Sequence, residues 1–148
     1  KGLMRLATAK DEIMVQQERK VRENPAYSTI TMLSRVISRL GSLNSVTPEQ
    51  LEGLVLPDIS YLREFYNRIN QQGNTYILSD TLSPLRTRIS SGARVSGGVT
   101  SYPLDTLHEE VAFIAYHFHW QQNDILNLDH KTRQRWVTEI NKINQKIL

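Results

Sequence analysis

The chain has 148 residues and no cysteine, which excludes disulfide bonds, thiolate metal sites and cysteine-based catalysis. Its formal net charge of +3 is too small an excess of base to indicate nucleic-acid binding, and no run of about 18 apolar residues predicts a membrane span. The length allows one domain or two very small ones, and with no secretory signal in view we expect a cytoplasmic protein.

The first 23 residues fit two different local structures. Apolar and polar residues alternate around Met4 and again around Ile13, and Lys10-Asp11 favours a turn, so the pattern predicts a small β-hairpin. The alternative is a short helix over residues 11–20, because Glu, Gln, Lys and Arg all favour helix. Both remain open, and we expect a short β or irregular segment before the first long helix.

Start and stop signals divide residues 24–73 into three helices, predicted over 24–41, 47–57 and 58–73. Each begins at an Asn, Thr or Asp that can cap it, and the first and last end at glycines. Thr47 and Gln50 have the spacing of a capping box. The apolar residues that we expect to face the core are Ile30, Leu33, Ile37, Leu40, Ile59, Leu62, Tyr66 and Ile69. Residues 1–73 are therefore predicted as one mainly helical domain.

Residues 74–102 differ from their neighbours because they are rich in Ser, Thr and Gly. They carry Arg86, Arg88 and Arg94 but no acid after Asp80. This composition is typical of an extended linker. Because aromatic residues are sparse here, the arginines do not predict a nucleic-acid site.

Residues 103–148 predict a helical hairpin. The first helix carries an apolar stripe of Leu104, Leu107, Val111, Ile114 and Phe118, and a second stripe of Phe113, Tyr116 and Trp120. The second helix begins at Asp129, a plausible N-cap, and its stripe includes Trp136. We place Glu109 and Glu110 near the start of the first helix, where negative charge suits the helix dipole. The predicted solvent face of the second helix holds Lys131, Arg133, Arg135, Lys142 and Lys146.

The histidines of the hairpin are the only candidate metal ligands with suggestive spacing. His108 has alanine, not histidine, four residues later, and His117 and His119 point to different sides of a helix. We therefore expect no metal site. No acid–base–nucleophile set meets the requirements of an active site either, so we expect no enzyme and no cofactor.

Large aromatic residues are the candidate partner-binding residues, because Trp and Tyr are preferred anchors at protein interfaces. They are Tyr61, Phe65, Phe113, Tyr116, Trp120 and Trp136. Two interpretations stay open: these residues form an intramolecular core, or part of their surface is a groove for another chain. Self-association is one form of the second interpretation.

Four stretches of the first half resemble a known family: residues 3–13 (LMRLATAKDEI), 24–27 (NPAY), 33–41 (LSRVISRLG) and 54–70 (LVLPDISYLREFYNRIN). They resemble the T4-type baseplate hub assembly chaperones, or tail assembly proteins, of contractile phage tails and extracellular contractile injection systems. Residues 107–120 (LHEEVAFIAYHFHW) and the following segment resemble a small uncharacterised helical domain from the same gene clusters. Some relatives carry a Cys-x-x-Cys pair after the helix that ends near Asn70, and this chain has none.

The resemblance implies a non-enzymatic assembly factor, or chaperone, that binds apolar segments of a tail, tape-measure or baseplate protein. It carries over no catalytic residue. The alternative is a permanent structural subunit of the baseplate or tail particle, which would use the same apolar faces as fixed interfaces.

Overall fold

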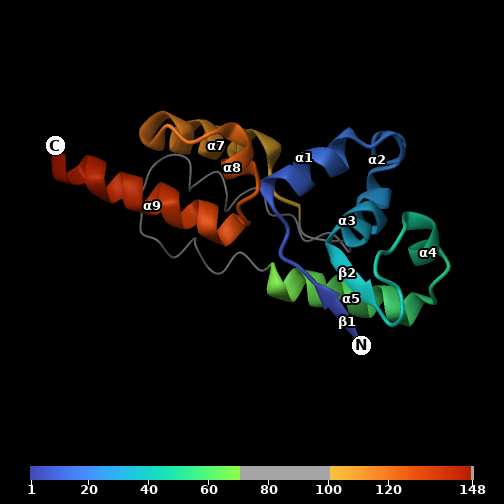
Figure 1. The fold of residues 1–148 in the computed structure, drawn as a ribbon. Helices are drawn as coiled ribbons and strands as arrows, with labels where there is room; N and C mark the ends of the chain where they lie inside the picture. Colours follow the sequence, from blue (N-terminus) through green and yellow to red (C-terminus); the bar gives the residue numbers. More distant parts are fainter. Residues whose placement is uncertain (71–100, 148) are drawn as a thin grey trace. The chain divides into compact units, whose positions relative to one another are not determined.

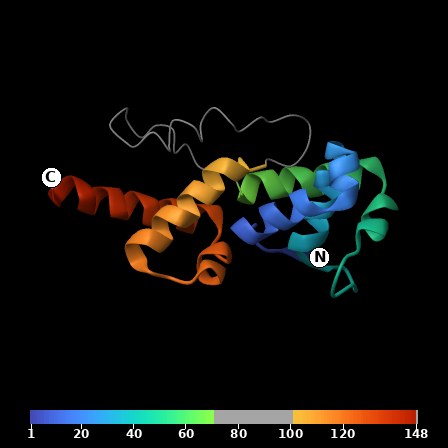
Figure 2. The same ribbon diagram turned by 90° about the horizontal axis from the view of Figure 1, so that it is seen from above.

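Helices dominate the computed structural model, which describes residues 1–70 and 101–147 (Figures 1 and 2). The mainly α fold predicted from the sequence is therefore confirmed, with one small two-stranded sheet among these residues. The described residues form two compact units: residues 1–7 with 11–70, and residues 8–10 with 101–147. Within these ranges, no helix combines the length and the apolar composition that crossing a bilayer requires.

The N-terminal β-hairpin predicted around Lys10-Asp11 is wrong. Residues Ala9–Gln17 form helix α1, as the alternative prediction held for this region, and Arg19–Glu23 form α2. The alternation around Met4 does mark a strand, β1 (Gly2–Met4). Its antiparallel partner, however, is β2 (Ile37–Leu40), with Leu3 opposite Arg39 and an irregularity before Met4. The local alternation identified the strand. It did not identify the partner of the strand, which lies more than thirty residues away in the sequence.

The helix predicted over 24–41 is shorter than expected. Asn24 caps a 3-10 turn, Pro25–Tyr27, by accepting a hydrogen bond from the Ala26 N–H at 3.2 Å. Helix α3 follows at Ser28–Val36, and the chain then becomes strand β2. Gly41 has the positive φ of 59° that favours glycine, but it occupies the turn after β2 and does not end a helix.

The next two helices differ from the prediction in their bounds: the first ends at Glu52 and not at residue 57, and the N-cap of the second is Val55 and not Asp58. Helix α4 (Pro48–Glu52) has the predicted capping box between Thr47 and Gln50. Helix α5 (Leu56–Ile69) begins before Pro57, so this proline starts α5 and does not end α4, as its fixed φ allows in a first turn. The prediction that this helix ends at Gly73 lies outside the described residues.

The core of the first unit joins α1, α2, α3, α4 and α5. Leu33, Leu51 and Tyr66 have no exposed surface, and Ile37 of β2 is 4 % exposed. Ile30, Leu40, Ile59 and Leu62 pack against this core while keeping part of their surface exposed. Of these, Leu40 and Leu62 also line the candidate site described below.

The second unit contains α7 (Leu104–Phe118), α8 (Gln122–Leu126) and α9 (His130–Ile147). Helices α7 and α9 lie side by side in both views and bury Val111, Ile114, Ile125, Val137 and Ile140 (Figures 1 and 2). The predicted cap is confirmed, because Asp129 Oδ2 accepts the Thr132 N–H at 3.2 Å. Helix α8, which lies between the two predicted helices of the hairpin, was not predicted.

The predicted linker, residues 74–102, falls mainly on residues that the structure does not describe. Its last residue, Tyr102, is described and is 2 % exposed within the second unit. Two short contacts at residues 8–10 also belong to this unit: Thr8 forms an isolated bridge with Asp129, and Ala9 N–H donates to Leu128 O at 3.3 Å.

Candidate partner-binding site

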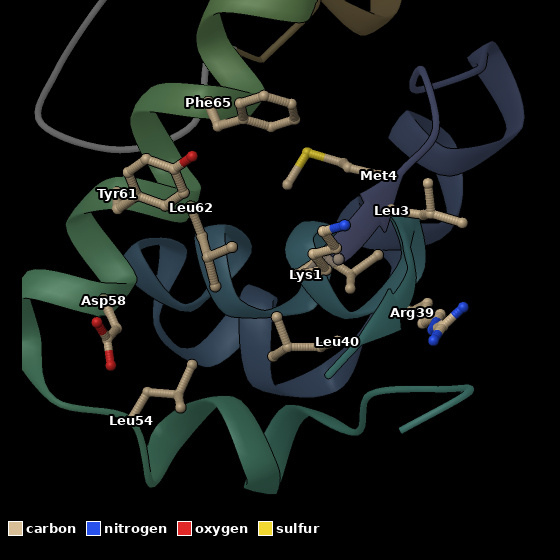
Figure 3. Close-up of a pocket in the computed structure, with 12 residues that line it drawn as sticks. Lys1, Leu3, Met4, Arg39, Leu40, Leu54, Asp58, Tyr61, Leu62 and Phe65 are labelled. Carbon is tan, nitrogen blue, oxygen red and sulfur yellow. The ribbon is translucent and has the colours of Figure 1, made fainter. Parts of the chain in front are cut away.

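A pocket of about 540 Å³ opens in the first unit between the β1–β2 ribbon and helix α5 (Figure 3). On α5 its lining residues are Asp58, Tyr61, Leu62 and Phe65, which share one side of the helix because they follow at intervals of three, one and three residues. The remaining lining residues are Lys1, Gly2, Leu3, Met4, Ile37, Arg39, Leu40 and Leu54.

Several apolar side chains that line the pocket also pack against the core of the unit. Figure 3 shows Met4 and Phe65 pointing toward one another, with Leu62 extending into the same hollow. Leu40, Leu54 and Leu62 each pack against the core of the unit. The pocket is therefore held open by side chains that the fold has already fixed, as is usual for binding sites.

Tyr61 and Phe65 form the aromatic side of the pocket. Their ring centroids lie 6.4 Å apart with an interplanar angle of 22°. Phe65 is partly buried and Arg68 lies 5.4 Å from its ring centroid, whereas Tyr61 is 62 % exposed. Two of the six predicted partner-binding residues are thus brought together at one hollow.

Three of the residues that line this pocket carry charge. Lys1, Arg39 and Asp58 are exposed, and Arg39 Nε donates to the Gly41 carbonyl at 3.3 Å. Because the interior offers aliphatic and aromatic surface, the arrangement suits the capture of apolar side chains better than acid–base chemistry.

The other four predicted residues belong to the second unit, and they do not share one surface. Trp120 and Trp136 meet edge to face with centroids 5.6 Å apart, and Phe118 joins them at 5.0 and 5.5 Å. Trp120 keeps 39 % of its surface exposed, while Phe113 and Trp136 pack against the core.

Tyr116 stands apart from this aromatic cluster. It is 78 % exposed, and as the second residue after the buried Ile114 it lies about 160° around α7 from the core-facing side. The predicted stripe of Phe113, Tyr116 and Trp120 is therefore split. The left-handed residue His119, with φ 56°, ends α7 before Trp120.

The prediction that Arg133 faces solvent is wrong, because it has no exposed surface. Its Nε donates to Glu110 Oε2 at 2.7 Å, so Glu110 is a buried ion-pair partner, 1 % exposed, and not merely a dipole-favouring residue. A signal was present in the sequence: Arg133 precedes Val137 by four residues and Ile140 by seven, which is the spacing of one helix face.

Three further side chains close this buried network. Tyr102 OH donates to Glu110 Oε1 at 2.5 Å and accepts from Gln134 Nε2 at 3.3 Å. His130 stacks on the Tyr102 ring at 4.5 Å, and its Nδ1 lies 2.6 Å from an Arg133 nitrogen. Burial and then the negative charge of Glu110 raise the pKa of Tyr102 well above its ordinary value of 10.0. Since every member is at most 5 % exposed, the network holds α7 and α9 together and is closed to a substrate.

The first unit buries an acid in a different way. Asp11 is 1 % exposed and accepts hydrogen bonds from two arginines: Arg5, at 2.5 and 2.9 Å, and Arg35 Nε, at 3.0 Å. The Asp11 hydrogen bond is the main cause that raises the pKa of Arg5. Sequence reasoning did not identify Asp11 as a buried acid, because its partners come from the residue after β1 and from α3.

The histidines considered as metal ligands lie apart. His117 Nδ1 is 2.9 Å from the Phe113 carbonyl and its Nε2 is 3.3 Å from Asn144, while His108 and His119 are exposed. Across residues 1–70 and 101–147, no three His, Asp or Glu side chains come together in a way that would hold a metal ion.

Comparison with known proteins gives one match. A family described as a family of unknown function, DUF6760, matches residues 99–148, about a third of the chain. This range includes α7, α8 and α9 with the buried network between them. Searches of curated proteins and of solved structures returned no match.

Proposed function

We propose that the protein is a non-enzymatic assembly factor of a contractile phage tail or contractile injection system, binding an apolar segment of a tail or baseplate protein. The proposed setting rests on the resemblance of residues 3–73 to tail assembly chaperones. The act of binding is supported by one observation, the open apolar pocket between the β1–β2 ribbon and α5.

The size and lining of the pocket set what it can hold. A volume of about 540 Å³ lies in the range of small-molecule and peptide side-chain sites, and it accommodates two or three apolar side chains of a client. Covering Tyr61 and Leu3, which are 62 % and 63 % exposed, would remove further apolar surface from water at about 25 cal/mol per Å².

Pull-down of candidate tail, tape-measure and baseplate proteins, produced together with this chain, tests the proposal. Tyr61→Asp places a charge at the pocket without disturbing a buried residue, and we expect it to weaken client capture by about tenfold or more. Leu56→Asp is the matched control, because Leu56 lies on the same helix, is 77 % exposed and does not line the pocket. Equal capture by both variants would contradict the proposal.

Quantifying the protein in assembling and finished particles separates the two roles considered for it. An assembly factor is present during assembly and is lost from the purified particle. A fixed stoichiometry in finished particles would instead identify a permanent structural subunit that uses the same pocket as an interface.

A further inference from the structure

The aromatic cluster of the second unit continues along α9 as an apolar row whose last two members, Ile143 and Ile147, are exposed. Trp136, Ile143 and Ile147 follow at intervals of seven and four residues, so they lie on one side of the helix. Trp120 packs on Trp136 at one end of this row. We refer to Trp120, Trp136, Ile143 and Ile147 as the α9 stripe.

Three of the four side chains of the α9 stripe are exposed, and Trp136 is partly buried. Trp120 is 39 % exposed, Ile143 52 % and Ile147 77 %, whereas Ile140, on the same helix, is 2 % exposed against α7. From Trp136 to Ile147 the stripe extends about 17 Å at 1.5 Å per residue. This length matches about three turns of a partner helix.

A row of basic residues borders the α9 stripe. Each of Arg135, Lys142 and Lys146 directly precedes a member of the stripe, which places it about 100° around the helix, and Lys131 continues the row. All four are exposed. Glu139 is the single acid in α9, and it is paired with Lys142 at 2.9 Å. The border is therefore strongly positive.

Charge decides which occupant suits this surface. In helix pairs, residues beside the apolar seam select partners of opposite charge, so an acidic amphipathic helix gains contacts at the basic row while its apolar side covers the stripe. A second copy that presented the same stripe would bring two basic rows together, which is unfavourable. Residues 71–100 do not offer a complementary row of charge, because their sequence holds three arginines and one acid.

We propose that the α9 stripe is a docking site for an acidic amphipathic helix of another protein. This goes beyond the proposed function, since it concerns the second unit and does not depend on the pocket or on tail assembly. Trp120 is the aromatic anchor, Ile143 and Ile147 extend the contact, and the basic row selects the charge of the partner.

A pair of synthetic peptides tests the charge rule on the full-length chain. One is a helical peptide of about 14 residues with leucines at helical spacing and glutamates on both flanks, and the other replaces every glutamate by lysine. Trp120 and Trp136 are the two tryptophans of the chain, so their fluorescence reports binding at the stripe itself. We expect the glutamate peptide to bind at least about tenfold more tightly, and the difference to shrink as salt screens the basic row.

Three variants locate the peptide on the surface. The double replacement Ile143→Ser with Ile147→Ser removes exposed side chains, so the fold is retained, and we expect binding to weaken by about tenfold or more. Arg135→Glu with Lys146→Glu should reverse the preference toward the lysine peptide. Tyr116→Ala is the matched control, because this exposed aromatic lies on the opposite side of α7 and should leave affinity unchanged.

Several results would overturn the inference. They are equal binding of the two peptides, unchanged affinity in the Ile143 and Ile147 double variant, and a concentration-dependent dimer in sedimentation that competes with the peptide, which would make a second copy the occupant. The pocket variant Tyr61→Asp separates the two proposals. In that variant tail-protein capture should be lost and peptide binding retained, whereas the Ile143 and Ile147 double variant should lose peptide binding and keep tail-protein capture.

Discussion

Each unit holds a buried carboxylate against arginine, Asp11 in the first and Glu110 in the second, but the two acids are satisfied differently. Asp11 in the first unit is held by Arg5 and Arg35, whose side chains remain 43 % and 30 % exposed. Glu110 in the second unit is held by Arg133, which has no exposed surface, and by the hydroxyl of Tyr102. The first acid therefore has two cations that water also reaches, whereas the second has one cation that is fully desolvated.

This difference determines how much stability each unit loses when one member of its ion pair is removed. An ion pair removed from water loses hydration on both sides, so taking away one partner leaves an uncompensated charge in the interior. Removing one partner of a partly exposed pair costs less stability, because water and the second arginine replace the missing contact. The buried carboxylate of the second unit thus depends on a single arginine, while that of the first unit keeps one arginine when the other is removed.

The largest expected effect comes from breaking the buried pair. Glu110→Ala should lower the unfolding free energy of the second unit by about 3–5 kcal/mol, because Arg133 is left charged and buried. Arg35→Ala should cost the first unit only about 1 kcal/mol, because Arg5 still holds Asp11. Urea titrations followed by tryptophan fluorescence measure the second unit, and hydrogen exchange of α1 and α3 measures the first.

Replacing both members of the pair provides the control for that prediction. Glu110→Leu combined with Arg133→Met removes both charges at similar volume, and we expect it to recover most of the stability lost in Glu110→Ala. If the double variant is as unstable as the single one, the loss comes from packing and the comparison between the units fails.

The buried tyrosine hydroxyls give the next largest contrast. Tyr102→Phe should cost about 1–3 kcal/mol, since it leaves Glu110 and Gln134 without the hydroxyl that joins them. Tyr66 has no hydrogen-bond partner for its buried hydroxyl among the described residues, so Tyr66→Phe should be neutral or stabilising. Chemical denaturation of both variants checks this, and an equal loss in the two would show that Tyr66 is hydrogen-bonded in solution.

Alkaline pH should weaken both units. Burial is the first cause that raises the pKa of Tyr66 and of Tyr102 above their ordinary value of 10.0. The unfolded chain therefore releases these protons first, so the stabilisation is complete below pH 10.0 and is lost as the pH rises toward the folded-state pKa. In that window each tyrosine should lower the free energy of unfolding by about 1.4 kcal/mol per pH unit. Unfolding measured at pH 8 and at about pH 11 tests this, with Tyr102→Phe expected to flatten the slope in the second unit only.

The helix caps should give the smallest effect and no difference between the units. Thr47 accepts the Gln50 N–H at 3.2 Å in the first unit, and Asp129 accepts the Thr132 N–H at the same distance in the second. Thr47→Ala and Asp129→Ala should each lower the unfolding free energy by about 1 kcal/mol. Thermal melts measure both, and a much larger loss in either would mean that its side chain has a tertiary role beyond the cap.

Short-range features were predictable because neighbouring residues create them. The caps at Asn24, Thr47 and Asp129 were found from residue type and spacing, and helix formation depends on the same local hydrogen bonds. Tyr61 and Phe65 were also identified as candidates, but that they line a pocket with β1 was not foreseen. The chain segment opposite them begins more than fifty residues earlier in the sequence.

The sequence by itself determined that the chain is mainly helical and where several of its helices begin, because caps, prolines and apolar spacing act over a few residues. Only the tertiary structure decided that residues 37–40 leave α3 as a strand, because their partner is β1. It likewise decided that Arg133 is buried, because Glu110 and Tyr102 meet it from another part of the chain. A charge enters the interior when distant residues supply its counter-charge, and their approach is a property of the fold.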